Sequence, residues 1–271
     1  MDKFGLIGGK LGHSLSPAIH DLFFKYVGKV GSYELLETEL DEIPARMQAL
    51  RNGFKGVNVT IPHKLHVMPL LDGITDEAKA IGAVNTIKFT SDGAFGFNTD
   101  YFGFGRMLEY NEIFVKDQVC VVLGSGGAAR AVVKYLADAG ATKLFLVTRD
   151  ISKCDPHFQE IAPGLEVITY KELENLQGYC LVNCTPVGMF PKVAASPVPK
   201  SVNARFEASV DAIYNPSETL FLAQAKACGK KAVNGLFMLV AQAVAAQEIW
   251  QDEKYDSELI VKIMHDLEQK I

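Results

Sequence analysis

Apolar and polar positions alternate over residues 56–61, and this alternation is the clearest strand signal in the first part of the chain. Successive strand side chains point to opposite faces, so the apolar side chains share one face while Asn58 and Thr60 share the other. Pro62 ends such a strand and suits the first position of a helix, which predicts that Lys64 lies in the opening helical turn. A lysine there is unusual because a helix start is locally positive. A surface lysine after an ordinary strand is the simpler interpretation.

Strand-like and helix-like patterns alternate through the first hundred residues. The strand-like runs cover residues 4–8, 32–38, 55–61, 83–89 and 94–97. The helix-like runs cover residues 17–27, 41–52, 65–81 with breaks near Pro69 and Gly73, and 101–110. This alternation predicts a mostly parallel sheet with helices on its faces. The Asp92-Gly93 turn predicts that the last two strands form an antiparallel hairpin.

Two serines stand at the start of the first helix. Ser16 is a suitable N-cap, with Pro17 at the first helical position, and Ser14 lies two residues earlier. The backbone N–H groups and the dipole of a helix start favour an anion, so a ligand carboxylate would match this site. Helix capping alone would also explain Ser16.

Polar residues accompany the hairpin strands as well. Asn85 lies in the first of them, and Asp100 follows the second at an expected helix start. A helix start favours the negative charge of a carboxylate, and such a carboxylate can pair with a lysine. Capping of the helix is the alternative role for Asp100.

A glycine fingerprint opens the middle of the chain. An apolar strand over residues 118–123 is followed by Gly124, Gly126 and Ala129 in G-x-G-x-x-A spacing, and then by a helix rich in alanine and valine. This strand-turn-helix setting lets a dinucleotide pyrophosphate approach a helix N-terminus. We therefore predict a Rossmann-type dinucleotide-binding domain.

The residues after the next strand, 143–147, bear on the choice of dinucleotide. An NAD-binding chain carries an acidic residue there for the ribose hydroxyls. Here Thr148 and Arg149 follow the strand, and Lys153 comes four residues after Arg149. These cations suit a 2′-phosphate and favour NADP, whereas Asp150 could neutralise Arg149, which leaves NAD possible.

The last third of the chain continues the pattern. Its expected strands cover residues 179–184, 210–213 and 231–233, and its expected helices cover residues 219–228, 236–250 and 257–271. Ligands bind beyond the carboxyl ends of parallel strands, so the loops after the first two strands are expected near a nicotinamide. Gln242 interrupts the most apolar helix, and a buried amide there needs partners. A structural hydrogen bond and a substrate contact both fit.

Composition narrows the class of function. The 271 residues are 48% hydrophobic and 22% charged, with a formal charge of −5, so no nucleic-acid footprint is expected and the partner should be a small molecule. No apolar run suits a membrane span or a signal peptide. The five cysteines form no metal-type cluster, so we expect no metal site, reduced thiols and a cytoplasmic protein.

Taken in order, the motifs of nearly the whole chain resemble those of the shikimate dehydrogenase family. They are His13-Ser14-Leu15-Ser16-Pro17, Asn58-Val59-Thr60-Ile61-Pro62-His63-Lys64, Gly82-Ala83-Val84-Asn85-Thr86, Asn98-Thr99-Asp100, the glycine loop, Asp211-Ala212-Ile213-Tyr214-Asn215-Pro216, and Asn234-Gly235-Leu236 with Gln242. The resemblance implies a two-domain α/β fold. A mostly parallel substrate domain would span residues 1–100, completed by helices over residues 236–271, and a Rossmann domain would span residues 101–235.

The resemblance also implies an activity, the reversible NADPH-dependent reduction of 3-dehydroshikimate to shikimate in aromatic amino acid (chorismate) biosynthesis, by a monomer or homodimer. Lys64 and Asp100 would be the catalytic pair. The residues that would bind substrate are Ser14 and Ser16 for the carboxylate, and Thr60, Asn85, Gln242 and Tyr214 around the ring. The residues that would bind the cofactor are Gly124, Ser125, Gly126, Gly127, Ala128, Thr148, Arg149, Lys153, Thr185, Met189, Gly235 and Met238.

Three segments depart from the family pattern. The chain has Thr148-Arg149-Asp150 where Asn-Arg-Thr is frequent, Asn183-Cys184-Thr185-Pro186 where Asn-Ala-Thr-Ser is frequent, and Asp21 where asparagine is common. The first departure weakens the choice of NADP over NAD.

Other functions compete with this one. The nearest is a dual quinate/shikimate dehydrogenase using NAD or NADP, although Ser16 favours shikimate. A catalytically silent dinucleotide sensor would not need Lys64 and Asp100. A glutamyl-tRNA reductase would need a nucleophilic cysteine in its N-terminal domain, and the first cysteine of this chain is Cys120.

Overall fold

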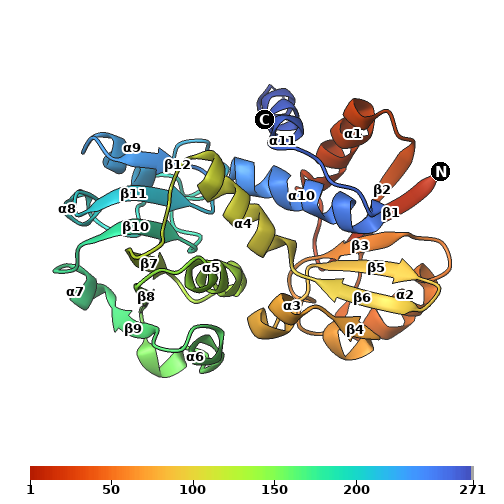
Figure 1. Ribbon diagram of the computed structural model, residues 1–271, viewed down its shortest axis with the longest axis horizontal. Helices are drawn as coiled ribbons and strands as arrows, with labels where there is room; N and C mark the ends of the chain where they lie inside the picture. Colours follow the sequence, from red (N-terminus) through yellow and green to blue (C-terminus); the bar gives the residue numbers. More distant parts are fainter. Residues whose placement is uncertain (270–271) are drawn as a thin grey trace. The chain divides into compact units, whose positions relative to one another are not determined.

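The computed structural model describes residues 1–269, and this part of the chain forms two compact units. Unit 1 consists of Met1–Gly103 and the segment from Val240 onward, and unit 2 consists of Phe104–Leu239. Figure 1 shows both units. Residues 270 and 271, at the end of the helix predicted over residues 257–271, lie outside the described residues.

Unit 1 is built on a mixed sheet of six strands. In spatial order they are β2 (Gly31–Glu37), β1 (Asp2–Gly8), β3 (Gly56–Val59), β5 (Thr86–Thr90), β6 (Gly93–Phe97) and β4 (Gly73–Ile74). β1 pairs in parallel with β2 and β3, as the alternation of strands and helices predicted. β5 and β6 form the antiparallel hairpin that the Asp92-Gly93 turn predicted.

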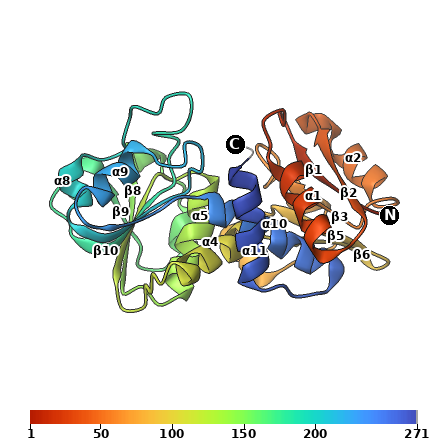
Figure 2. The same cartoon turned by 90° about the horizontal axis from the view of Figure 1, so that it is seen from above.

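Helices cover both faces of this sheet. They are α1 (Ser16–Val27), η1 (Leu40–Glu42), α2 (Ile43–Leu50), η2 (Met68–Leu70), α3 (Asp76–Ile81), the start of α4 (Thr99–Tyr110), the end of α10 (Leu236–Gln251), and α11 (Ser257–Glu268). Met47 of α2 packs with Ile7 in the core on one face. On the other face, Trp250 of α10 stacks on Phe4 at 4.8 Å between ring centroids. There α1 and α11 lie side by side (Figure 2).

The helix predicted over residues 65–81 is wrong in its first half. Residues 61–67 form turns, followed by η2 and the short strand β4, and only α3 is a true α-helix. Lys64 therefore lies in a turn and not at a helix start. The reason is a tertiary hydrogen bond, because the carbonyl of Lys64 accepts from the backbone N–H of Val84 at 2.9 Å and is not available to a helix.

Unit 2 has a parallel sheet of six strands (Figure 1). In spatial order they are β12 (Lys231–Val233), β11 (Phe206–Asp211), β10 (Gly178–Asn183), β7 (Val119–Leu123), β8 (Lys143–Thr148) and β9 (Glu166–Thr169). Counted along the chain from β7, this is the order 3-2-1-4-5-6 of the Rossmann fold, which confirms the predicted domain type. β9 was not predicted from the sequence, and β11 begins earlier than predicted.

Short helices connect these strands, and one long helix follows the glycine loop. They are α5 (Gly127–Asp138), η3 (Ile151–Lys153), α6 (His157–Ile161), α7 (Tyr170–Leu173), α8 (Lys200–Asn203) and α9 (Leu220–Lys226), together with the rest of α4 and the start of α10. The strand order reverses between β7 and β10. In an open parallel sheet this reversal is where a crevice for a ligand forms, at the carboxyl ends of the strands.

None of the helices among residues 1–269 is both long enough and apolar enough to span a membrane.

Candidate active site

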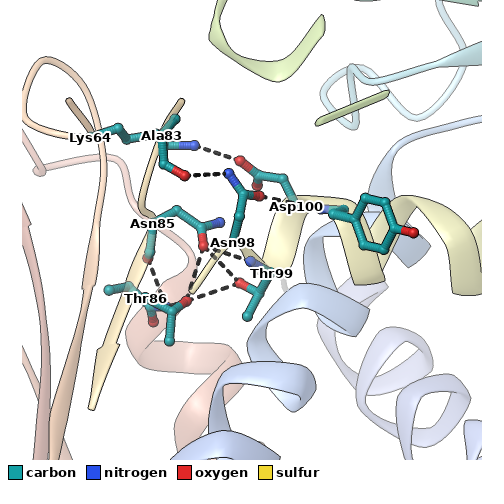
Figure 3. Close-up of polar contacts among 9 residues, drawn as sticks. Lys64, Ala83, Asn85, Thr86, Asn98, Thr99 and Asp100 are labelled. Atoms are coloured by element: carbon teal, nitrogen blue, oxygen red, sulfur yellow. Dashed lines mark hydrogen bonds and ion pairs between the residues drawn. The ribbon is translucent and has the colours of Figure 1, made fainter. Parts of the chain in front are cut away.

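Lys64 and Asp100 form an ion pair in unit 1. The Lys64 Nζ atom lies 2.6 Å from Asp100 Oδ2 (Figure 3), and the two side chains are 18% and 8% exposed. Lys64 comes from the turn after β3, and Asp100 comes from the first turn of α4, where the sequence pattern predicted it. A short contact in a largely buried place holds the ammonium group in one position.

Asn98 explains why Asp100 is available for this pair. Asn98 Oδ1 accepts from the backbone N–H of Tyr101 at 3.4 Å, as an N-cap does, and Asn98 Nδ2 donates to the carbonyl of Ala83 at 2.9 Å. The alternative that Asp100 caps the helix is therefore wrong. No role for Asn98 was predicted from the sequence, although asparagine directly before a helix is a common cap signal.

Asn85 is fixed by hydrogen bonds to its side-chain oxygen. Asn85 Oδ1 accepts from the backbone N–H of Thr99 at 2.7 Å and from the Thr86 hydroxyl at 3.1 Å (Figure 3). Within the described chain, Asn85 Nδ2 donates to no acceptor. The amide nitrogen is therefore the part of Asn85 that can bind a ligand.

The predicted N-cap role of Ser16 is wrong. α1 begins at Ser16 itself, Leu15 takes the N-cap position, and the Ser16 backbone N–H donates to Ser14 Oγ at 3.2 Å. Within residues 1–269, no backbone N–H of α1 donates to the Ser16 hydroxyl, so this hydroxyl does not cap the helix. Both serines are half-buried at the helix start, where an anion would be stabilised.

Tyr33 connects the serines to the strand of Asn58. Burial raises the pKa of Tyr33, while a hydrogen bond from the Ser16 side chain opposes the rise, so the phenol stays protonated at neutral pH. The Tyr33 hydroxyl donates to Asn58 Oδ1 at 2.7 Å, and Asn58 Nδ2 donates to the Thr86 hydroxyl at 3.0 Å. One hydrogen-bond network thus joins the start of α1 to the start of α4. Tyr33 was not predicted from the sequence.

Thr60 and Gln242 are the remaining predicted substrate contacts of unit 1. The backbone N–H of Thr60 donates to the carbonyl of Ile7 at 2.9 Å, and the Thr60 side chain is half-buried. The expectation of a buried, partnered amide at Gln242 is wrong, because that side chain is half-buried and makes no hydrogen bond within residues 1–269. The buried amide of α10 is Gln247, whose Nε2 lies 2.9 Å from Nδ1 of His20. Thr60 and Gln242 therefore keep polar groups free for a ligand.

Unit 2 contains a pocket of about 400 Å³ at the carboxyl ends of its strands. Its lining residues are Gly124, Ser125, Gly126, Val147, Thr148, Arg149, Tyr170, Cys184, Thr185, Pro186 and Val187. The glycine loop, Thr148, Arg149 and Thr185 of this set were predicted from the sequence. Tyr170 was missed, although Thr169 and Glu172 form a capping box that marks a helix start there.

The glycine loop fits a dinucleotide pyrophosphate. A side chain at Gly126 or Gly127 would point into open space, since no atom lies within 4 Å of where its Cβ would be, so the backbone is open to a ligand. Gly124 has a φ of +89°, which favours glycine. With glycine at its N-cap, α5 also presents its first N–H groups uncovered by a side chain.

Asp150 does not pair with Arg149, contrary to one of the sequence alternatives. Its carboxylate caps η3, accepting from the Ser152 backbone N–H at 3.1 Å and the Ser152 hydroxyl at 2.6 Å, and it lies 3.3 Å from Lys153 Nζ. Hydrogen bonds from Ser152 and Lys153 lower the pKa of Asp150. Arg149 is exposed at the pocket, whereas Lys153 is held outside its lining.

The other predicted cofactor and substrate residues of unit 2 lie outside this lining. They are Gly127 and Ala128 at the start of α5, Met189 after β10, Tyr214 after β11, and Gly235 and Met238 around the start of α10. Met189 is exposed, Met238 is buried and Tyr214 is half-buried. Burial also raises the pKa of Tyr214.

Comparison with known proteins agrees with this arrangement. The family model for the shikimate dehydrogenase substrate binding domain matches residues 6–87. Shikimate dehydrogenase (NADP(+)) of Clostridium beijerinckii is 46% identical over 260 residues, which cover 96% of this chain and 95% of that protein. The enzyme of the same name from Methanocaldococcus jannaschii is 39% identical over 259 residues, with 91% and 90% covered.

Solved structures agree as well. A chorismate mutase/shikimate 5-dehydrogenase fusion protein from Clostridium acetobutylicum superposes with a TM-score of 0.94 at 48% identity, covering 100% of this chain and 98% of that chain. Shikimate 5-dehydrogenase from Thermus thermophilus in complex with NADP(H) and shikimate gives 0.88 at 36% identity, with 98% and 99% covered. The chain therefore belongs to the shikimate dehydrogenase family.

Proposed function

We propose that this chain is an NADP-dependent shikimate dehydrogenase, an oxidoreductase that reversibly reduces 3-dehydroshikimate to shikimate in aromatic amino acid (chorismate) biosynthesis. The relatives that cover nearly the whole chain carry this activity in their names. Within the molecule, one observation carries the proposal. This is the ion pair of Lys64 and Asp100, which is 2.6 Å long and largely buried.

Lys64 supplies the proton of the reaction. NADPH, when bound, supplies a hydride to the C3 carbonyl carbon. As the C3–O double bond becomes single, negative charge develops on the oxygen, and the Lys64 ammonium stabilises it and transfers a proton to it. In the reverse direction neutral Lys64 takes the hydroxyl proton. Its partial exposure lets solvent restore the proton between turnovers.

Asp100 orients this lysine. With its carboxylate 2.6 Å from Nζ, the lysine side chain loses rotamer freedom before substrate arrives, which lowers the entropy cost of a productive geometry. Asp100 also has a second carboxylate oxygen, which can accept from a ring hydroxyl of the substrate.

The other polar residues of unit 1 hold the substrate. Ser14 and Ser16 bind the carboxylate at the positive end of α1. Thr60, the amide nitrogen of Asn85 and Gln242 bind ring hydroxyls, and Tyr214 of unit 2 is a further substrate contact. The half-burial of the serines, Thr60 and Gln242 supports this assignment.

Unit 2 holds the cofactor. The glycine loop with Ser125, Gly127 and Ala128 binds the pyrophosphate, and Thr148 and Arg149 bind the 2′-phosphate. Thr185, Met189, Gly235 and Met238 are assigned to the nicotinamide side. The exposure of Arg149 at the pocket and the engagement of Asp150 elsewhere support NADP over NAD.

We also place the enzyme in the cytoplasm, as a monomer or homodimer. The five cysteines are free thiols, which suits a reducing compartment.

One assay tests the activity. Purified protein is expected to oxidise shikimate with NADP at a much higher kcat/KM than shikimate with NAD or quinate with either cofactor. Faster turnover of quinate with NAD would assign the chain to the dual quinate/shikimate dehydrogenases, and no turnover of either substrate would overturn the proposal.

A further inference from the structure

Asp211 is a fully buried carboxylate that the reaction described above does not use. It is the last residue of β11 in unit 2, it is 0% exposed, and no cation of the described chain pairs with it. Burial raises the pKa of Asp211 to about 6. Keeping a carboxylate in such a place costs free energy unless hydrogen bonds offset the lost hydration, so its partners indicate what it does.

Three groups from different segments donate to this carboxylate. Asn183 Nδ2, at the end of β10, and the backbone N–H of Ile213, after β11, both donate to Oδ1 at 3.0 Å. The hydroxyl of Thr219, the N-cap of α9, donates to Oδ2 at 2.7 Å. Asp211 is therefore the common acceptor for three chain segments at the carboxyl end of the sheet.

Asn183 extends this network to the wall of the dinucleotide pocket. Asn183 Oδ1 accepts from the Thr185 backbone N–H at 3.0 Å and from the Thr185 hydroxyl at 2.7 Å. Thr185 Oγ1 in turn accepts from the backbone N–H of Val187 at 3.2 Å. Thr185 and Val187 both line the pocket. Asp211 thus fixes the orientation of the Asn183 side chain, and Asn183 in turn fixes the backbone of residues 185–187, which form one wall of the pocket.

Residues 185–187 have little room to move toward the glycine loop. A Cβ atom added to Gly124 would lie 2.7 Å from the Thr185 methyl group, so the glycine loop and the Thr185 segment are in close contact. Displacement of Thr185 toward the glycine loop would therefore reduce the space for the cofactor.

A second set of hydrogen bonds from Asp211 and its neighbours fixes the backbone next to Tyr214. Besides the Ile213 N–H bond to Asp211, the Ile213 carbonyl accepts from Gly235 at 2.9 Å, and the Ala212 N–H donates to the Asn183 carbonyl at 2.9 Å. One carboxylate therefore anchors both the Thr185 wall and the backbone next to Tyr214.

We propose that Asp211 is a positioning residue for dinucleotide binding, which acts through Asn183 on the Thr185–Val187 wall of the pocket. The inference rests on the proposed function of unit 2 as the dinucleotide-binding unit. It predicts that removing the acceptor weakens cofactor binding, whereas an isosteric acceptor preserves it.

The test is NADPH affinity, read from the fluorescence of the bound nucleotide at pH 7.5 and normalised to the folded fraction. Asp211→Ala is expected to raise the dissociation constant at least tenfold. Asp211→Asn, which keeps an oxygen toward Asn183 and Ile213, is expected to stay within threefold of the unmodified protein. Glu207→Gln, an exposed carboxylate on the same strand, serves as the control and should change nothing. If Asp211→Ala does not fold, Asp211→Ser replaces it.

Other outcomes overturn the inference. A merely structural Asp211 would lower the yield of folded protein while the folded fraction binds NADPH with unchanged affinity. Equal weakening by Asp211→Asn and Asp211→Ala would show that the charge, and not the acceptor geometry, matters. Because binding is read without turnover, a protein that binds NADPH but does not oxidise shikimate overturns only the proposed activity. A protein that binds no dinucleotide overturns both.

Discussion

The carboxylate of Asp100 holds the ammonium of Lys64 at 2.6 Å, and it can do so because Asn98 caps α4 in its place. Two neighbouring polar residues thus divide two tasks that a single aspartate could have performed. This division gives Asp100 a part in the chemistry and Asn98 a part in placing it.

Asp100→Asn tests the first part. An amide lacks the charge that orients the lysine, so kcat for shikimate oxidation is expected to fall on the order of 100-fold, within the usual range for a general acid–base group and its partner. The measurement is steady-state kinetics with saturating NADP. A variant with kcat within threefold of the unmodified enzyme would show that the ion pair is incidental.

Asn98→Ala tests the second part. It removes a helix cap and leaves the buried Ala83 carbonyl without its donor, which is expected to lower the free energy of unfolding by about 2 kcal/mol. It should also lower kcat several-fold, because the start of α4 no longer holds Asp100. Urea unfolding and kinetics check both effects, and Ser91→Ala in the exposed hairpin turn is the matched control. Unchanged stability would remove the capping role.

Cofactor selectivity depends on where the carboxylate of Asp150 points. Ser152→Ala removes the shortest of the three contacts that hold this carboxylate, and leaves the Ser152 backbone N–H and Lys153 in place. The less firmly held negative charge should repel the 2′-phosphate beside Arg149. The ratio of kcat/KM for NADP to that for NAD is expected to fall roughly three- to tenfold, an energy of about 1 kcal/mol. Asp150→Asn should raise this ratio, and Glu174→Gln, exposed in the same unit, should leave it unchanged. The prediction fails if Ser152→Ala and Asp150→Asn both keep the original ratio.

Burial of Asp211 predicts a dependence of stability on pH. Its pKa rises from 3.8 in the unfolded chain to about 6 in the folded protein. Between pH 3.8 and pH 6 the folded protein therefore keeps a proton on Asp211 that the unfolded chain has lost. Its contribution therefore favours folding at low pH and is lost as the pH rises through about 6, by about 3 kcal/mol. The Cys184 thiol also faces this carboxylate, and burial raises the pKa of that thiol.

The variant Asp211→Asn isolates this contribution. Burial lowers the pKa of His20 to about 3, so the contribution of His20 to stability is lost as the pH falls, opposite to that of Asp211. For this reason the informative quantity is the difference in unfolding free energy between the unmodified protein and the variant. Asp211→Asn is expected to gain about 3 kcal/mol relative to the unmodified protein between pH 4 and pH 7.5, measured by urea unfolding. A difference that does not vary with pH would mean that the buried carboxylate is not perturbed.

Local sequence patterns predicted the features that depend on local backbone chemistry. The glycine fingerprint placed the β7–α5 turn, and the Asp92-Gly93 pair placed the hairpin, because each needs particular residues at fixed offsets. The helix assigned to Lys64 failed because a hydrogen bond from Val84, twenty positions along the chain, takes the carbonyl that the helix needed.

The parts of the site that sequence did not predict depend on distant contacts. Asp211 and Asn183 both lie in or beside recognised motifs, yet no local pattern shows that these side chains meet across two strands. Likewise, Tyr33 joins the network only because β1 brings β2 and β3 together. Residue type and local motifs indicate which residues could belong to the site, whereas the sheet topology determines which of them are in contact.

Lys64→Ala tests the role of Lys64 in the reaction directly, with Lys55→Ala as the control. Lys55 is an exposed lysine of unit 1 whose ion-pair partner within residues 1–269 is Asp2. The measurement compares kcat with the shikimate dissociation constant from calorimetry. We predict that kcat falls by about 100- to 10,000-fold while the dissociation constant changes by less than about threefold. A Lys64→Ala enzyme that turns over shikimate at the unmodified rate would show that Lys64 does not supply the proton.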